Sequence, residues 1–277
     1  NQPVQTNEST GPVWVTRSLM LAVISPAKTL DFESPSLTSS SSCPEFLDHS
    51  ESLINKLRTL SESKLSSLMS ISSKLAALNQ QRYQDWNLPF TASNSKQAIM
   101  AFKGDVYTGF NFEKYNEKDF AYAQSHLRIL SGLYGLLRPL DLIQPYRLEM
   151  GTKLRTPQGK DLYEFWSSTL TNALNGAIKN SGIQILVNLA SNEYYNVVDK
   201  SALRGRVITP IFKDQKRGDF KVVSFFAKKA RGAMSDYLVR HRIGEPEGLK
   251  EFNGLGYRFN QNLTSDDNWV FTRKEAA

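Results

Sequence analysis

Short apolar stretches of strand length alternate along this chain with longer segments of helical periodicity, and this alternation limits the possible folds most strongly. Residues 20–24 and 183–187 are apolar stretches of the length typical of buried strands. Residues 160–179 instead place their large apolar side chains on one side of a helix. No repeat or change of composition marks a linker. The sequence therefore predicts one α/β (mixed α+β) domain, with a mixed central sheet surrounded by helices.

The remaining elements are expected from the same periodicities and from capping residues. Asn116, with Asp119 three residues later, is expected to begin a helix. Gly182 is expected to end the helix over 160–179. The predicted helices cover residues 44–60, 63–86 with an interruption at 70–73, 94–102, 116–127, 160–179 and 227–243, and the predicted strands cover 20–24, 183–189, 207–212, 220–226 and 269–272.

Composition excludes several classes of protein. The 277 residues are 40% hydrophobic and contain no apolar run near the ~18 residues that a membrane helix needs. The single cysteine, Cys43, cannot form an internal disulfide, which fits a reducing compartment. The three histidines are isolated in sequence, so we expect neither a metal site nor a cofactor. Residues 1–19 lack the apolar centre of a signal peptide and are expected to be a disordered extension or a remnant of cloning, which leaves residues 20–277 as the domain.

Positive charge is concentrated in one part of the chain. Residues 200–242 contain twelve Lys or Arg and three Asp, whereas the whole chain has a net charge of only +7. Lys228, Lys229 and Arg231 lie where a predicted strand meets a predicted helix, so they could contact a phosphate backbone together. Charge runs of this kind are often merely solvated, but an excess this local favours an anionic partner.

Several short segments combine a glycine or proline with charged or hydroxyl side chains beside apolar residues, which is typical of loops that a core holds in place. At the end of a strand such groups can bind a ligand or supply acid–base chemistry, although ordinary turn and capping chemistry is the alternative. For an enzyme, Asp105 or Glu149 would be the general base. The full set of candidate catalytic residues is Lys28, Lys103, Asp105, Tyr107, Arg147, Glu149, Asn188 and Glu193.

The interruption at residues 70–73 resembles a DNA-binding helix-hairpin-helix element. That element has the pattern Leu-x-Gly-Ile-Gly-x-Lys-x-Ala, in which hairpin N–H groups and the start of the next helix hold a phosphate. Residues 68–76 match its apolar positions, its lysine and its alanine, with serine at both glycine positions. The alternative is a plain turn between two packed helices. The candidate phosphate contacts are Ser70, Ser72, Ser73 and Lys74.

Six strings together resemble the YaaA peroxide-stress resistance family, and the resemblance extends from residue 20 to about residue 273. The strings are MLAVISPAKTLDF (20–32), AFKGDVYTG (101–109), LSGLYGLLRPLD (130–141), PYRLEMG (145–151), NLAS (188–191) and AKKARG (227–232). The resemblance implies a cytoplasmic protein made under hydrogen peroxide stress that limits free intracellular iron and oxidative damage. It also implies a single mixed α/β domain with a positively charged cleft, and binding of double-stranded DNA through a helix-hairpin-helix.

Two function classes follow. The first is a non-enzymatic, monomeric DNA-binding stress protein that contacts phosphates through Ser70, Ser72, Ser73, Lys74, Lys228, Lys229 and Arg231, with little sequence specificity and no membrane partner. The second is an uncharacterised enzyme that acts on a phosphorylated or nucleic-acid substrate in the same basic cleft, because the family brings no assigned reaction with it.

Overall fold

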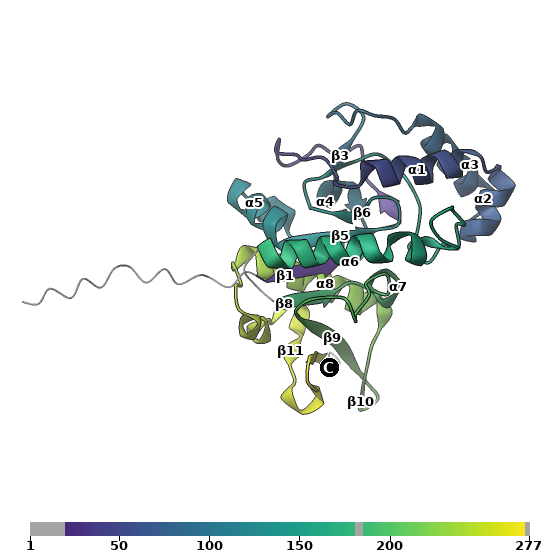
Figure 1. Cartoon of the computed structure of the whole chain (residues 1–277). Helices are drawn as coiled ribbons and strands as arrows, with labels where there is room; N and C mark the ends of the chain where they lie inside the picture. Colours follow the sequence, from purple (N-terminus) through teal and green to yellow (C-terminus); the bar gives the residue numbers. More distant parts are fainter. Residues whose placement is uncertain (1–19, 181–184, 275–277) are drawn as a thin grey trace, which may run out of the picture.

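A mixed sheet of eight described strands forms the centre of the fold, and the computed structural model describes residues 20–180 and 185–274 (Figure 1). β1 pairs in parallel with β5 and β8, β8 with β9, and β9 with β12, whereas β6, β10 and β11 run antiparallel to their neighbours. The order is β11 (Arg258–Phe259), β12 (Asn268–Arg273), β9 (Arg206–Lys216), β8 (Ile185–Leu189), β1 (Leu21–Ile24), β5 (Leu127–Ser131) and β6 (Gly135–Leu137), with β10 (Asp219–Lys221) paired to β9. The predicted mixed sheet is confirmed.

Two pairs of two-residue strands connect loops that are distant in sequence. β2 (Thr29–Leu30) pairs with β4 (Phe102–Lys103), and β3 (Lys96–Gln97) pairs with β7 (Leu142–Ile143). Thr29 lies opposite Lys103 in the first pair. The loop that follows β1 is therefore fixed beside the loop that contains Gly104 and Asp105.

Helices cover the sheet on both sides. In Figure 1, α6 crosses in front of the sheet and α8 lies behind it, while α1, α2 and α3 form a separate layer at the upper right. The α-helices are α1 (Leu47–Arg58), α2 (Glu62–Met69), α3 (Ser73–Asp85), α4 (Ala98–Ala101), α5 (Glu117–His126), α6 (Leu162–Asn180), α7 (Asn192–Tyr195) and α8 (Ser224–Arg240). The 3₁₀ helices are η1 (Tyr107–Gly109), η2 (Phe112–Lys114), η3 (Pro246–Glu251), η4 (Gly254–Gly256) and η5 (Gln261–Leu263).

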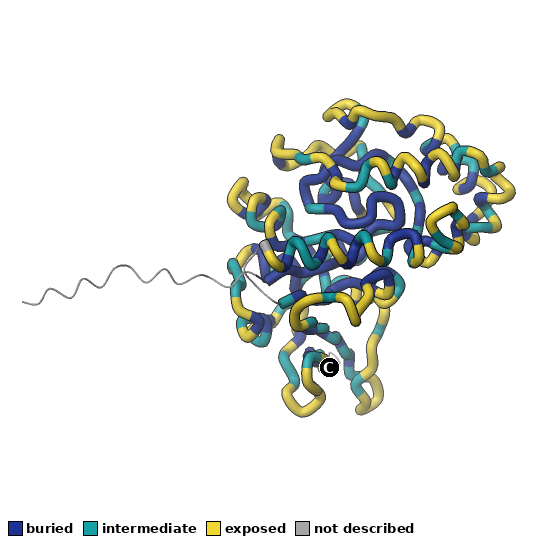
Figure 2. The backbone as a smooth tube through the Cα atoms, in the orientation of Figure 1, coloured by how far each residue is buried: buried dark blue, intermediate teal, exposed yellow. Residues whose placement is uncertain are grey.

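The core is continuous through the central strands and the inner faces of the helices (Figure 2). All four residues of β1 are buried, as expected for a strand with parallel neighbours on both sides. Trp166 of α6 is fully buried, and its indole Nε1 donates to the Gly132 carbonyl at 2.9 Å. Asn116 and Asp119 form the expected capping box at the start of α5. Periodicity and capping thus predicted the long helices well.

Three expectations differ from the structure. Within 94–102 only Ala98–Ala101 is helical, because the flanking residues pair with β7 and β2. Phe225 and Phe226 belong to helix α8 rather than to a strand over 220–226. β5 and β6 had no predicted counterpart, although β5 is the immediate parallel neighbour of β1. Residues 1–19 and Gly182, for which expectations were also stated, lie outside the described residues.

Candidate functional site

The polar segments that follow β1 and β8 meet at one edge of the sheet. The two strands are parallel and Ile24 lies opposite Leu189, so both chains leave the sheet side by side. The Ser25 hydroxyl accepts a hydrogen bond from the Ser191 amide at 2.9 Å and lies 3.3 Å from the Ser191 Oγ. The carboxyl edge of parallel strands is where open α/β sheets usually bind ligands.

A cavity of about 300 Å³ lies at this edge. Residues from four distant segments line it, which are the loops after β1, β4 and β8 and the first half of α8. Its charged side chains are the cations Lys28, Lys103, Lys228 and Arg231 and the carboxylates Asp105 and Glu193. The cations outnumber the carboxylates, so the cavity favours an anionic ligand.

Two glycines allow α8 to approach the Asp105 loop closely. A Cβ at Gly232 would overlap the carbonyl oxygen of Val106 and lie 2.7 Å from its carbonyl carbon. A Cβ at Gly109 would likewise overlap the α8 backbone at Lys229 and Ala233. Backbone contact of this kind is possible only where side chains are absent. It fixes the cavity wall formed by α8 against the wall that carries Asp105.

Most charges around the cavity are paired. Lys28 Nζ lies 3.0 Å from Glu149, which also binds Arg147 at 2.8 Å. Lys103 lies 3.1 Å from Asp31, and hydrogen bonds from Ser34 and Lys103 hold the pKa of that carboxyl well below its usual range. Lys28 and Lys103 are both more than half exposed, so these pairs orient the two ammonium groups only weakly.

The rim of the cavity also contains a looser pair. Lys228 lies 3.8 Å from Asp105, and both side chains are partly exposed. The Lys228 ammonium therefore keeps N–H donors available for a ligand.

Arg231 differs from these cations, because within the described parts of the chain no carboxylate forms an ion pair with it. Its guanidinium is partly buried in the cavity wall, and this desolvation lowers its pKa. An arginine has five N–H donors in a planar fork that matches carboxylate and phosphate oxygens. Arg231 therefore presents a partly desolvated guanidinium to the cavity.

The structure brings six of the candidate residues to the cavity, places Tyr107, Asn188, Arg147 and Glu149 near it, and leaves those of the α2–α3 bend apart from it. Tyr107 is buried, burial raises its pKa, and its hydroxyl donates to the Ser25 carbonyl at 3.2 Å, so it supports the loop rather than titrating. Asn188 is buried beneath the edge and accepts from the Ala190 amide at 3.1 Å. Lys229 does not line the cavity, because consecutive helical residues point about 100° apart. Our sequence reasoning missed the Ser25–Ser191 pair, whose only signal was its position after two strands.

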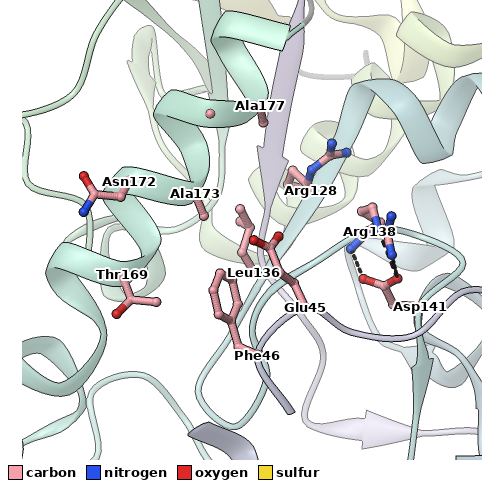
Figure 3. Close-up of a pocket in the computed structure, with 11 residues that line it drawn as sticks. Glu45, Phe46, Arg128, Leu136, Arg138, Asp141, Thr169, Asn172, Ala173 and Ala177 are labelled. Atoms are coloured by element: carbon pink, nitrogen blue, oxygen red, sulfur yellow. Dashed lines mark hydrogen bonds and ion pairs between the residues drawn. The ribbon is translucent and has the colours of Figure 1, made fainter. Parts of the chain in front are cut away.

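A larger cavity of about 580 Å³ lies between α6 and the β5–β6 region (Figure 3). Its two arginines are satisfied by the protein. Arg138 binds Asp141 at 2.9 Å, and Arg128 donates to the carbonyls of Gln124 and Leu127. Burial lowers the pKa of Arg128 to about 10. With Glu45 at its rim as well, this cavity has balanced charge and is the weaker candidate for an anion.

The serine segment forms a tight bend between α2 and α3. Ser70 adopts the left-handed conformation (φ 52°, ψ 50°) at the first glycine position of the helix-hairpin-helix pattern. The Ile71 amide donates to the Ser66 carbonyl at 3.1 Å, and the buried Ile71 side chain anchors the bend. Ser72 caps α3 by accepting from the Leu75 amide at 3.4 Å. Ser72 thus supports the bend as a helix cap, whereas Ser70 adopts at the first glycine position a backbone conformation that favours glycine.

The exposed side chains of this bend lie apart from the cavity. Ser70, Ser72, Ser73 and Lys74 are all exposed, and none of them lines the cavity. The other end of α3 is anchored beside the site, where the Tyr83 hydroxyl donates to the Arg147 carbonyl. In Figure 1, α7 and the α2–α3 pair both lie toward the right-hand side of the molecule.

The site and the bend both fall within a match to a known family. A family model described as peroxide stress protein YaaA matches residues 20–263. The chain belongs to the YaaA family. It is also similar to a UPF0246 protein of Cellvibrio japonicus (strain Ueda107), with 57% identity over 256 residues that cover 92% of this chain and 99% of that relative.

The described part of this YaaA-family chain contains neither a metal-binding cluster nor a helix of membrane-spanning length and polarity. No three His, Cys, Asp or Glu side chains gather as a possible metal site within residues 20–180 and 185–274. In the same ranges, no helix is long and apolar enough to cross a membrane.

Proposed function

We propose that this YaaA-family protein binds double-stranded DNA during peroxide stress, through backbone phosphates and with little readout of base sequence. The observation that supports it most is Arg231, a desolvated guanidinium with no ion pair to the described residues, in a cavity that also contains Lys28, Lys103 and Lys228. Phosphate oxygens would supply the missing acceptors. The family's role in limiting free intracellular iron and oxidative damage is the physiological setting that we infer for this binding.

The bend between α2 and α3 would provide a second phosphate contact. Ser73 and Lys74 begin a helix of 13 residues, so their amides precede the first intrahelical hydrogen bond and point away from the helix. The helix dipole favours an anion at this end, and the exposed Lys74 ammonium adds a full charge. We infer that the bend and the cavity together hold one duplex.

Lys74→Ala tests the contribution of the bend. We expect it to weaken binding about equally for duplexes of different sequence, and to reduce the slope of log affinity against log salt by about one. The measurement is fluorescence anisotropy of a labelled duplex at several salt concentrations. Lys118→Ala is the control, because Lys118 is exposed on α5 at the opposite end of the molecule in Figure 1. Identical behaviour of the two variants would remove the bend from the proposal.

The second candidate function is an enzyme that acts on a phosphorylated or nucleic-acid substrate in the same cavity. The observation in its favour is that Asp105 and the Ser25–Ser191 pair border the space into which Arg231 faces. A carboxylate in that position could serve as a general base. Glu149 is less suited to that role, because Lys28 and Arg147 both bind it.

Asp105→Asn separates the two functions. If the protein only binds DNA, the variant should bind a duplex as well as the wild type or slightly better, because Lys228 loses its carboxylate partner at 3.8 Å. It should also still protect cells from hydrogen peroxide. The measurements are duplex affinity and survival of a complemented deletion strain. Intact binding with lost protection would instead support catalysis by Asp105.

A further inference from the structure

Large apolar side chains are exposed where β10 leads into α8. Val222, Phe225 and Phe226 are 54%, 56% and 38% exposed. The Phe225 and Phe226 rings meet edge to face at 5.6 Å. Arg273 lies over the Phe226 ring at 4.6 Å, whereas Phe225 is the most exposed of the three. Exposed aromatic side chains that lie together on one surface commonly mark a binding site.

Phe225 lies next to the candidate site along α8. Residues three and four positions apart on a helix are surface neighbours, with Cβ atoms about 5–6 Å apart. Phe225 is three residues before Lys228 and four before Lys229. Lys228 lines the cavity, and Arg231 follows it one turn later. Helical spacing therefore places the exposed ring beside Lys228 and Lys229, less than two turns before Arg231 on the same helix.

We propose that Phe225 is a stacking platform for an unpaired nucleobase, so that the ligand of this cleft is a nucleic acid with a single-stranded or unstacked segment. This inference rests on the proposed nucleic-acid binding and deepens it. The faces of bases in a continuous duplex are covered by their neighbours, so a protruding phenylalanine can stack only on a base that is unpaired or unstacked. Its position beside Lys228 places the next phosphate within reach of the cavity.

Charge and shape favour a nucleic acid over a second copy of this chain or an anionic membrane as the ligand of this surface. A second copy of the chain would bring two surfaces of the same positive sign together, because residues 200–242 contain nine more basic than acidic residues. An anionic membrane would contact Phe225 and the exposed lysines, but a flat surface cannot enter the cavity to reach the partly buried Arg231. A phosphate chain with a flipped base can contact both.

The test compares Phe225→Leu, which keeps an apolar side chain but removes the aromatic face, with Phe225→Trp, which keeps the face. Leu37→Ala is the control, since Leu37 is a 50% exposed apolar residue outside the site. The probes are a labelled oligothymidylate, a perfect duplex and vesicles of anionic phospholipid, each at several salt concentrations. Thermal unfolding confirms that each variant is folded.

We expect Phe225→Leu to weaken oligothymidylate binding by about five- to a hundredfold while duplex binding changes less than twofold. Phe225→Trp should bind the oligothymidylate as well as the wild type. Unchanged oligothymidylate binding by Phe225→Leu, with salt-dependent binding of both polymers intact, would overturn this inference and leave the proposed function standing. If the wild type binds neither the oligothymidylate nor the duplex, both this inference and the proposed function are overturned. An equal loss on all three probes would identify a general apolar contact and also overturn the inference.

Discussion

Replacing Lys228 and Arg231 together by alanine is expected to weaken duplex binding about thirtyfold at physiological salt. The estimate assumes two lost phosphate contacts, each of which contributes about 0.9 to the slope of log affinity against log salt. The slope itself should therefore decrease by about two. Both residues line the cavity from one face of α8. Because Arg231 has no carboxylate partner among the described residues, its positive charge is not already neutralised by the protein.

The matched control for this prediction is Lys118→Ala/Lys179→Ala, which removes the same charge. Both lysines are exposed, on α5 and in the last turn of α6, and neither lines the cavity. Salt titrations of all three proteins against one labelled duplex give the comparison. Equal losses in the two double variants would mean that only net charge matters, and the cavity would then not be the DNA-binding site.

Gly232→Ala is expected to destabilise the protein by about 3 kcal/mol or more, which corresponds to a melting temperature lower by about 6–12 °C. The new Cβ would overlap the Val106 carbonyl oxygen, and backbone atoms on both sides leave no flexible side chain that could move away. Relief of the overlap requires α8 to separate from the Asp105 loop. Duplex binding by the folded fraction should fall as well, because the two cavity walls would separate.

Gly176→Ala provides the control for this effect. Gly176 lies inside α6, about one turn before its end, and a Cβ there would meet no neighbouring atom within 4 Å. We expect this variant to be as stable as the wild type or more stable by up to about 1 kcal/mol, since alanine is the better helix former. Thermal unfolding followed by circular dichroism measures both variants. A melting temperature of Gly232→Ala within a degree of the wild type would contradict the close backbone packing.

Local patterns predicted those parts of the fold that local interactions stabilise. The capping box at Asn116 and the apolar face of α6 are both signalled within a few residues. β5 and β6 are different, because two glycines interrupt residues 131–135 and the strands gain their stability from pairing with β1 and with each other. The helix expected over 94–102 failed for the same reason, since its ends pair with segments that are distant in sequence.

The candidate site was predictable as a set of polar segments but not as a geometry. The sequence indicated Lys28, Asp105 and Glu193 as candidates, and the structure brings them to one cavity. The sequence gave no sign that Lys28 and Lys103 pair with carboxylates while Arg231 has no such partner within residues 20–180 and 185–274. Which cation remains unpaired depends on contacts between four separate segments, and these follow only from the assembled fold.

The pairing of β1 also determines when this chain can fold during its synthesis. Leu21 lies opposite Leu186 and Ala22 lies opposite Leu127, so the first described strand has both of its partners more than a hundred residues further along the chain. Until the ribosome has released residue 189, one edge of a fully apolar strand has no partner. Such an edge can pair with another chain. We therefore expect chaperones to bind nascent chains that end before residue 189, and this binding should stop once β8 has emerged.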